Sequence, residues 1–117
     1  MILKKNIPKI ATILPYKESY TLEHASAVSL WVSSFFKKSI FRKNNYIYGN
    51  ANSKDKYLTK NYINISLQNL KIRFRSTSNE YIQKLIDEIL KLEFDIIEIH
   101  NRPLVLLKLM EIIKAKF

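Results

Sequence analysis

Short apolar segments rich in β-branched residues alternate with helical patterns along this chain, and this alternation constrains its fold more than any other feature. Strands are expected over 9–14, 45–49, 62–75 (with a break in side-chain parity at 68–69) and 95–100. Helices are expected over 27–38, 77–92 and about 104–115. This order predicts βαβ units, and hence an α/β fold: a Rossmann-like three-layer sandwich with a mostly parallel sheet.

The helix expected over 27–38 has one broad apolar face and clear ends. Its apolar side chains recur at helical spacing: Val28, Trp31, Val32, Phe35 and Phe36. Ser26 can cap its first turn, and Lys37 and Lys38 lie in its last turn, where cations suit the helix dipole. An apolar face of this kind is typical of a helix that packs on the core.

The second half of the chain begins with a capping box, Thr77 to Glu80. The helix that it opens carries an apolar face made of Ile82, Leu85, Ile86, Ile89 and Leu90. Two ion pairs at i, i+4 spacing are expected on it, Glu80–Lys84 and Asp87–Lys91. The apolar run in 95–100 then predicts a second buried strand.

The pattern over 104–115 is apolar nearly all round, which is typical of a helix buried on more than one side. A chain of 117 residues has little else to cover such a helix. We therefore expect residues 1–117 to form a single Rossmann-like domain that is truncated at its C-terminus.

Composition excludes several classes of site. The chain has no cysteine and two histidines, so neither a disulfide framework nor a zinc site is expected. One glycine cannot build a glycine-rich phosphate loop, and no organic cofactor or metal is predicted. No run of 18 apolar residues occurs, and Lys4, Lys5 and Lys9 interrupt any signal-peptide core. These observations favour a reducing compartment, and we expect the cytoplasm.

The net charge of +10 is concentrated in the first part of the chain. Residues 1–79 carry 14 Lys and Arg against 3 Asp and Glu. The abundance of Lys, Asn and Ile is also what AT-rich codons produce, so an anionic partner and codon bias both remain as explanations. The segment Lys71–Arg75 places three cations on one strand face, which fits either a phosphate-binding strand or a charged edge strand. A basic module that binds nucleic acid or an anionic surface without catalysis is therefore the alternative function.

Candidate ligand-binding residues cluster after the first and last expected strands. Ligands of parallel sheets bind at the carboxyl ends of strands, where the loops 15–26 and 100–103 lie. Each loop holds one histidine, His24 or His100. Alternation places Glu98 on the same face as His100, either to orient the imidazole or as a solvated edge residue.

Residues 101–103 have two interpretations. Pro103 suits the first turn of a helix, so Asn101 and Arg102 can be ordinary residues at its start. The same helix start with the Arg102 guanidinium could instead bind a phosphate or carboxylate.

Three blocks carry a family resemblance: Ile10 to Leu14 with Pro15-Tyr16, the segment 25–32, and Phe94-Asp95-Ile96-Ile97-Glu98-Ile99-His100-Asn101-Arg102-Pro103. They resemble the N-terminal half of family-4-type glycosyltransferases, bacterial enzymes of the two-domain GT-B fold that act in cell-surface polysaccharide and lipopolysaccharide synthesis. The resemblance implies that a sugar moves from a nucleotide-sugar donor to an acceptor hydroxyl without a metal, and that this domain holds the acceptor.

The resemblance also implies roles for individual residues. His100 would be catalytic, and the donor or acceptor would be bound by Lys17, Glu18, His24, Ser26, Ala27, Asn101 and Arg102. The family's glycine-rich first loop is replaced here by residues without glycine, which makes close approach of a phosphate to the backbone harder.

The partners implied are a nucleotide-sugar donor, a glycan or lipid-linked acceptor, and a C-terminal domain or partner chain that binds the nucleotide. Without that domain we expect the chain alone to be inactive. Nucleic acid is not an expected partner, whereas peripheral contact with the inner face of the membrane is.

Overall fold

The computed structural model describes residues 7–16, 18–51, 56–66 and 77–100, together with positions 107, 110 and 111. The strands are β1 (Ile10–Ile13), β2 (Asn45–Gly49), β3 (Tyr62–Asn64) and β4 (Ile96–Ile99). The helices are α1 (Ala27–Lys38) and α2 (Thr77–Ile89), with a short 3-10 turn η1 (Arg42–Asn44) before β2. The elements expected up to residue 100 are therefore present in the expected order, although β3 ends at Asn64.

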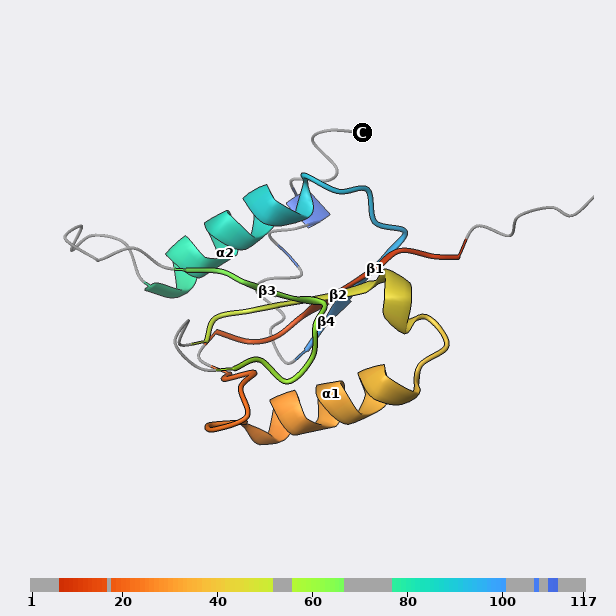
Figure 1. Cartoon of the computed structure of the whole chain (residues 1–117). Coiled ribbons are helices and arrows are strands. Elements are labelled where there is room, and N and C mark those ends of the chain that lie inside the picture. The colour runs from red at the N-terminus through yellow and green to blue at the C-terminus, as the bar shows by residue number, and fades with distance from the viewer. Residues whose placement is uncertain are drawn as a thin grey trace, which may run out of the picture.

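The four strands form one sheet in the order β3-β2-β1-β4, and all three pairings between neighbours are parallel. Across the sheet, the connection from β1 to β2 runs in one direction. The connection from β3 to β4 runs in the opposite direction, past β2 and β1. Because crossovers between parallel strands are right-handed, these opposite moves place their helices on opposite faces of the sheet. Figure 1 shows α1 and α2 on the two faces. The predicted three-layer α/β architecture is confirmed.

The layer between the sheet and α2 is apolar. Ala11, Ile13 and Tyr48 of the sheet pack with buried side chains of the helix: Tyr81, Ile82, Leu85, Ile86 and Ile89. Four of the five residues predicted for this helix face are thus buried, whereas Leu90 follows the helix and is exposed. The Lys84–Glu80 pair is present at 3.8 Å, but Lys91 pairs with Glu88 and not with Asp87.

The residues packed between the sheet and α1 differ from the apolar face predicted for this helix. Val32 and Phe36 pack against Leu14, Ile47 and Tyr62, but the other two buried residues of the helix are Ser29 and Ser33. Trp31 and Phe35 are more than half exposed, because they lie on the flank of α1 that faces β4, a strand that the helix does not cover.

The last strand, β4, is more exposed than predicted. Among the strands that the structure describes, β4 lies at the edge of the sheet, and its residues alternate between exposed and half-buried. Its Ile96 is exposed on the face of α1, because that helix covers the other strands. The apolar run in 95–100 therefore belongs to an edge strand and not to a buried one.

Several predicted features lie outside the described residues. These are the strand beyond Ser66, the capping side chains of residues 77–79, the basic segment Lys71–Arg75, and most of the helix expected over 104–115. Within the part of the chain that is described, no helix has the length and apolar character needed to cross a bilayer.

Candidate functional site

The carboxyl ends of β1 and β4 form the point where the chain changes its direction across the sheet. From β1 the chain passes through α1 to β2 on one side, while β4 pairs with β1 on the other side. In open parallel sheets the crevice outside such a pair of strand ends is the usual place for a ligand. The candidate site is therefore the region after Ile13 and Ile99.

Backbone hydrogen bonds hold both strand ends in place. The amide of His100 donates to the carbonyl of Ile13 at 3.0 Å, which extends the β1–β4 pairing by one residue. The amide of Leu14 donates to the carbonyl of Tyr48 at 2.8 Å. The carbonyl of Leu14 accepts from the buried Tyr81 hydroxyl at 2.7 Å. His100 thus projects from a fixed backbone, which is what a precise binding group needs.

His100 is paired with a carboxylate. Its Nε2 lies 2.8 Å from Oε1 of Glu98, and the imidazole side chain is 19% exposed. Because a carboxylate can only accept, this contact assigns the ring hydrogen to Nε2 and leaves Nδ1 of the neutral ring as an acceptor. Both predicted interpretations of Glu98 hold, since it is a solvated edge residue that also orients the imidazole.

Aromatic side chains of α1 complete the wall beside His100. The Trp31 ring meets the imidazole edge-on, with 5.6 Å between ring centroids, and stacks on Phe35 at 5.5 Å. A depression of about 350 Å³ lies here, lined by Ala27, Val28, Trp31 and His100. A small polar ligand would meet one aromatic surface and one imidazole in it.

The start of α1 borders this depression. The Ser26 side chain accepts from the amide of Ser29 at 3.1 Å, which confirms Ser26 as the N-cap. Among the described residues of this first turn, the amides of Ala27 and Val28 are left without an intrahelical acceptor. These two amides and His100 are the groups that could contact an anionic or hydroxyl-bearing ligand together.

The loop before α1 is more ordered by packing than its polar sequence indicates. Tyr20 and Thr21 are fully buried, and Thr21 forms an isolated antiparallel bridge with Tyr57. The Tyr20 hydroxyl lies 2.9 Å from the Thr59 hydroxyl, and burial raises the pKa of Tyr20 to about 12. Residues 18–26 therefore form a packed scaffold for the helix start.

The predicted site residues are only partly brought together. Ala27 and His100 line the same depression, and Ser26 directly precedes it. Glu18 is half-buried, with its amide donating to Pro15, and His24 is exposed, with its amide donating to Thr21. Neither is among the residues described as lining the depression. Three predicted residues lie outside the described part of the chain: Lys17, Asn101 and Arg102.

Helical spacing predicts a core position for Trp31, yet this side chain lies beside His100. The signal for this difference lies in the serines at 29 and 33, because they share a helix face with Val32 and Phe36. Their face is the buried one, so the aromatic pair one flank away is left for a ligand or partner.

Known proteins supply no guide to this site: no family model, no curated protein and no solved structure matches the chain. No group of three or more potential metal ligands occurs among the residues described.

Proposed function

We propose that this chain is the acceptor-side domain of a glycosyltransferase, which moves a sugar from a nucleotide-sugar donor to an acceptor hydroxyl. The observation that carries the proposal is the Glu98–His100 pair beside Trp31 and the start of α1, at the carboxyl ends of β1 and β4. The three sequence blocks that resemble family-4-type glycosyltransferases provide the same strand, helix and histidine.

The chemistry of the depression suits a saccharide. Nδ1 of His100 can accept a hydrogen bond from a sugar hydroxyl, and the carboxylate of Glu98 stabilises the imidazole in the orientation required. The exposed face of Trp31 can pack against the C–H groups of a sugar ring. The amides of Ala27 and Val28, at the start of α1, are suited to a phosphate oxygen of the donor.

The nucleotide would be bound by another domain or a partner chain across this edge of the sheet. We place the reaction in the cytoplasm, in cell-surface polysaccharide or lipopolysaccharide synthesis, as the resemblance implies. His100 would contact the reacting sugar, and Glu98 would act through His100 as a positioning residue.

Fluorescence tests the proposal directly, because Trp31 is the only tryptophan in the chain. The chain is titrated with UDP-glucose, GDP-mannose and neutral oligosaccharides while Trp31 emission is recorded. At least one of these probes should change the emission saturably. His100→Ala should weaken its binding about tenfold, the loss expected for one hydrogen bond to a ligand.

His24→Ala is the matched control, because it removes the other histidine, which does not line the depression. It should leave the titration unchanged. Equal weakening by both histidine substitutions, or no saturable response to any probe, would contradict a saccharide site at His100.

A further inference from the structure

The exposed surface of α1 and the turn after it carries four large apolar side chains. The exposed fractions are 51% for Leu30, 58% for Trp31, 55% for Phe35 and 83% for Ile40. Isolated exposed apolar residues are common, but Trp31 stacks on Phe35, and Phe35 and Ile40 line one groove, so these three form a contiguous patch that marks an interaction surface.

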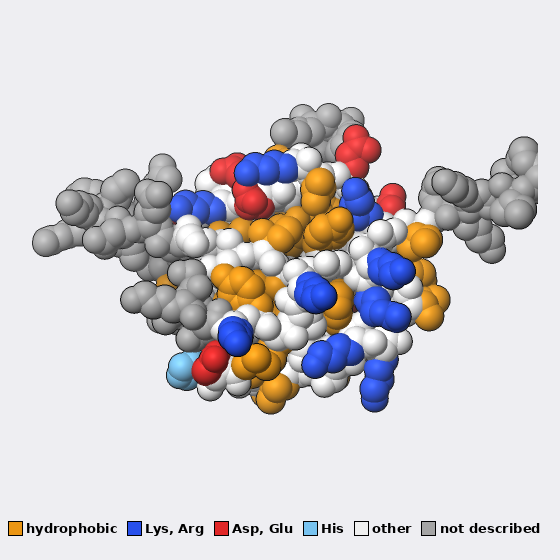
Figure 2. All heavy atoms as spheres, viewed as in Figure 1, with side chains coloured by type: hydrophobic (Ala, Val, Ile, Leu, Met, Phe, Trp, Pro, Cys, Tyr) orange, Lys and Arg blue, Asp and Glu red, His pale blue; other side chains and the backbone are white. Residues whose placement is uncertain are grey.

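The same surface is strongly basic. Lys37 and Lys38 end α1, and Arg42 and Lys43 follow in η1, all four exposed. The sequence contains no Asp or Glu between Glu23 and Asp55 to offset them. Figure 2 shows Lys and Arg side chains gathered over the end of α1 and the turn that follows it.

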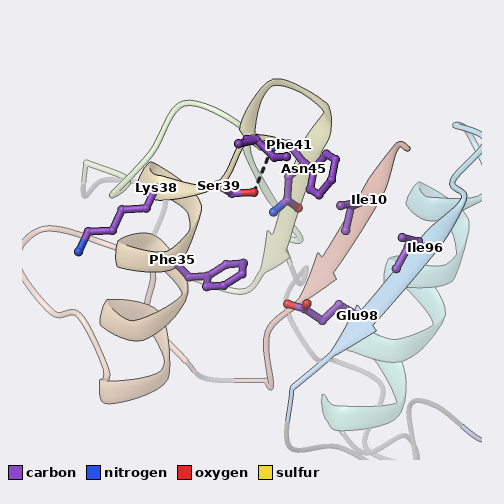
Figure 3. Close-up of a pocket in the computed structure, with 9 residues that line it drawn as sticks. Ile10, Phe35, Lys38, Ser39, Phe41, Asn45, Ile96 and Glu98 are labelled. Atoms are coloured by element: carbon purple, nitrogen blue, oxygen red, sulfur yellow. Dashed lines mark hydrogen bonds between the residues drawn. The ribbon is translucent and has the colours of Figure 1, made fainter. Parts of the chain in front are cut away.

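An apolar groove runs from this patch to the edge strand. Its volume is about 610 Å³, and its apolar lining comes from Ile10, Phe35, Ile40, Phe41 and Ile96. Figure 3 shows Phe35 pointing from α1 toward the sheet across this groove, while Lys38 points away from it. Apolar side chains are therefore presented beside cations that remain free to reach an anionic surface.

We propose that this patch docks the protein on an anionic lipid bilayer. Phe35 and Ile40 would enter the boundary between headgroups and acyl chains, and the four cations would contact anionic headgroups. Exposed Trp, Phe and Leu beside Lys and Arg on one helix are the combination that interfacial helices use. The proposal does not depend on the glycosyltransferase assignment.

Charge complementarity selects this occupant over two others. A second copy docked through the same patch would bring four cations against four, and like charges facing each other oppose association. Nucleic acid would satisfy the cations, but a duplex presents mainly phosphates on its outer surface and gives Ile40, which is 83% exposed, little apolar area to contact.

Vesicle co-sedimentation of the full chain provides the test. Vesicles of phosphatidylcholine alone are compared with vesicles that also contain phosphatidylglycerol, over a range of salt concentrations. Binding should require the anionic lipid, weaken with added salt, and shift Trp31 emission to shorter wavelength. Lys37→Ala/Lys38→Ala should weaken binding on the order of 25-fold, from about fivefold per lysine. Ile40→Ser should weaken it about tenfold.

Matched control variants change residues on the opposite side of the sheet, the side that α2 covers. Lys84→Ala/Lys91→Ala removes the same charge from α2 and the turn that follows it, and Leu90→Ser removes an exposed leucine in that turn. Circular dichroism verifies that every variant is folded. The controls should bind as the unchanged chain does. Absence of binding to anionic vesicles, binding that ignores lipid charge, or equal losses in the controls would overturn the proposal. Retention of RNA without binding to vesicles would assign the patch to nucleic acid instead.

Discussion

Replacing Gly49, the only glycine in the chain, by alanine tests how closely the sheet packs under α1. Gly49 ends β2, and a Cβ built on it would lie 2.9 Å from Oη of Tyr62 and 3.1 Å from Cδ1 of Leu14. The first distance is shorter than real Cβ contacts. Tyr62 cannot move easily, because it is buried, stacks on Tyr20 at 4.9 Å and donates to Asn64 at 2.9 Å.

Two opposing effects decide the magnitude. Alanine restricts the unfolded chain and stabilises the strand by about 0.5–1 kcal/mol relative to glycine. Overpacking a well-filled core costs about 1–3 kcal/mol. We therefore expect Gly49→Ala to lower the free energy of unfolding by about 0.5–2 kcal/mol.

Urea denaturation of the full chain measures this change, and a double-mutant cycle identifies its cause. Tyr62→Phe removes the Oη atom that the new Cβ would meet, so Gly49→Ala should cost about 1 kcal/mol less in that background. A Gly49→Ala variant as stable as the unchanged chain, or a cost that Tyr62→Phe does not reduce, would refute the packing argument.

Three further predictions concern stability. Ser26→Ala should lower the free energy of unfolding by about 1 kcal/mol in urea denaturation, because it removes the cap on the Ser29 amide. Tyr48→Phe should raise the free energy of unfolding by about 1 kcal/mol, since the Tyr48 hydroxyl is buried without a hydrogen-bond partner among the described residues. A lower free energy of unfolding would indicate that the hydroxyl does form a hydrogen bond. Burial raises the pKa of both Tyr20 and Tyr48 to about 12, above the value near 10 of an unfolded tyrosine. The unfolded chain therefore loses these protons first, so the free energy of unfolding should be constant up to about pH 10 and fall as the pH rises toward 12. Urea denaturation at each pH measures this change. A free energy of unfolding that stays constant over that range would contradict the burial of these hydroxyls.

Local patterns predicted the elements well because their signals lie within a few residues. The β-branched run before Pro15 forms β1, and Ser26 with Lys37 and Lys38 marks the two ends of α1. The alternation of these elements was sufficient to predict the three-layer architecture.

Burial was predicted less well, because it depends on which strands each helix covers. The apolar run in β4 resembles a buried strand, yet its place at the edge next to β1 leaves Ile96 exposed. Spacing alone likewise placed Trp31 in the core, although α1 packs through Ser29 and Ser33. The pairing of Glu98 with His100 was predictable, since strand alternation places both side chains on one face.

Mapping of backbone-amide chemical shifts tests most directly whether ligands bind at the carboxyl ends of β1 and β4. The full chain labelled with ¹⁵N is titrated with the nucleotide-sugar or oligosaccharide that changes Trp31 emission. The site described here predicts that the largest shifts fall in 26–31 and 98–100, and that His100→Ala reduces them. Shifts concentrated on α2, with these two segments unchanged, would contradict it.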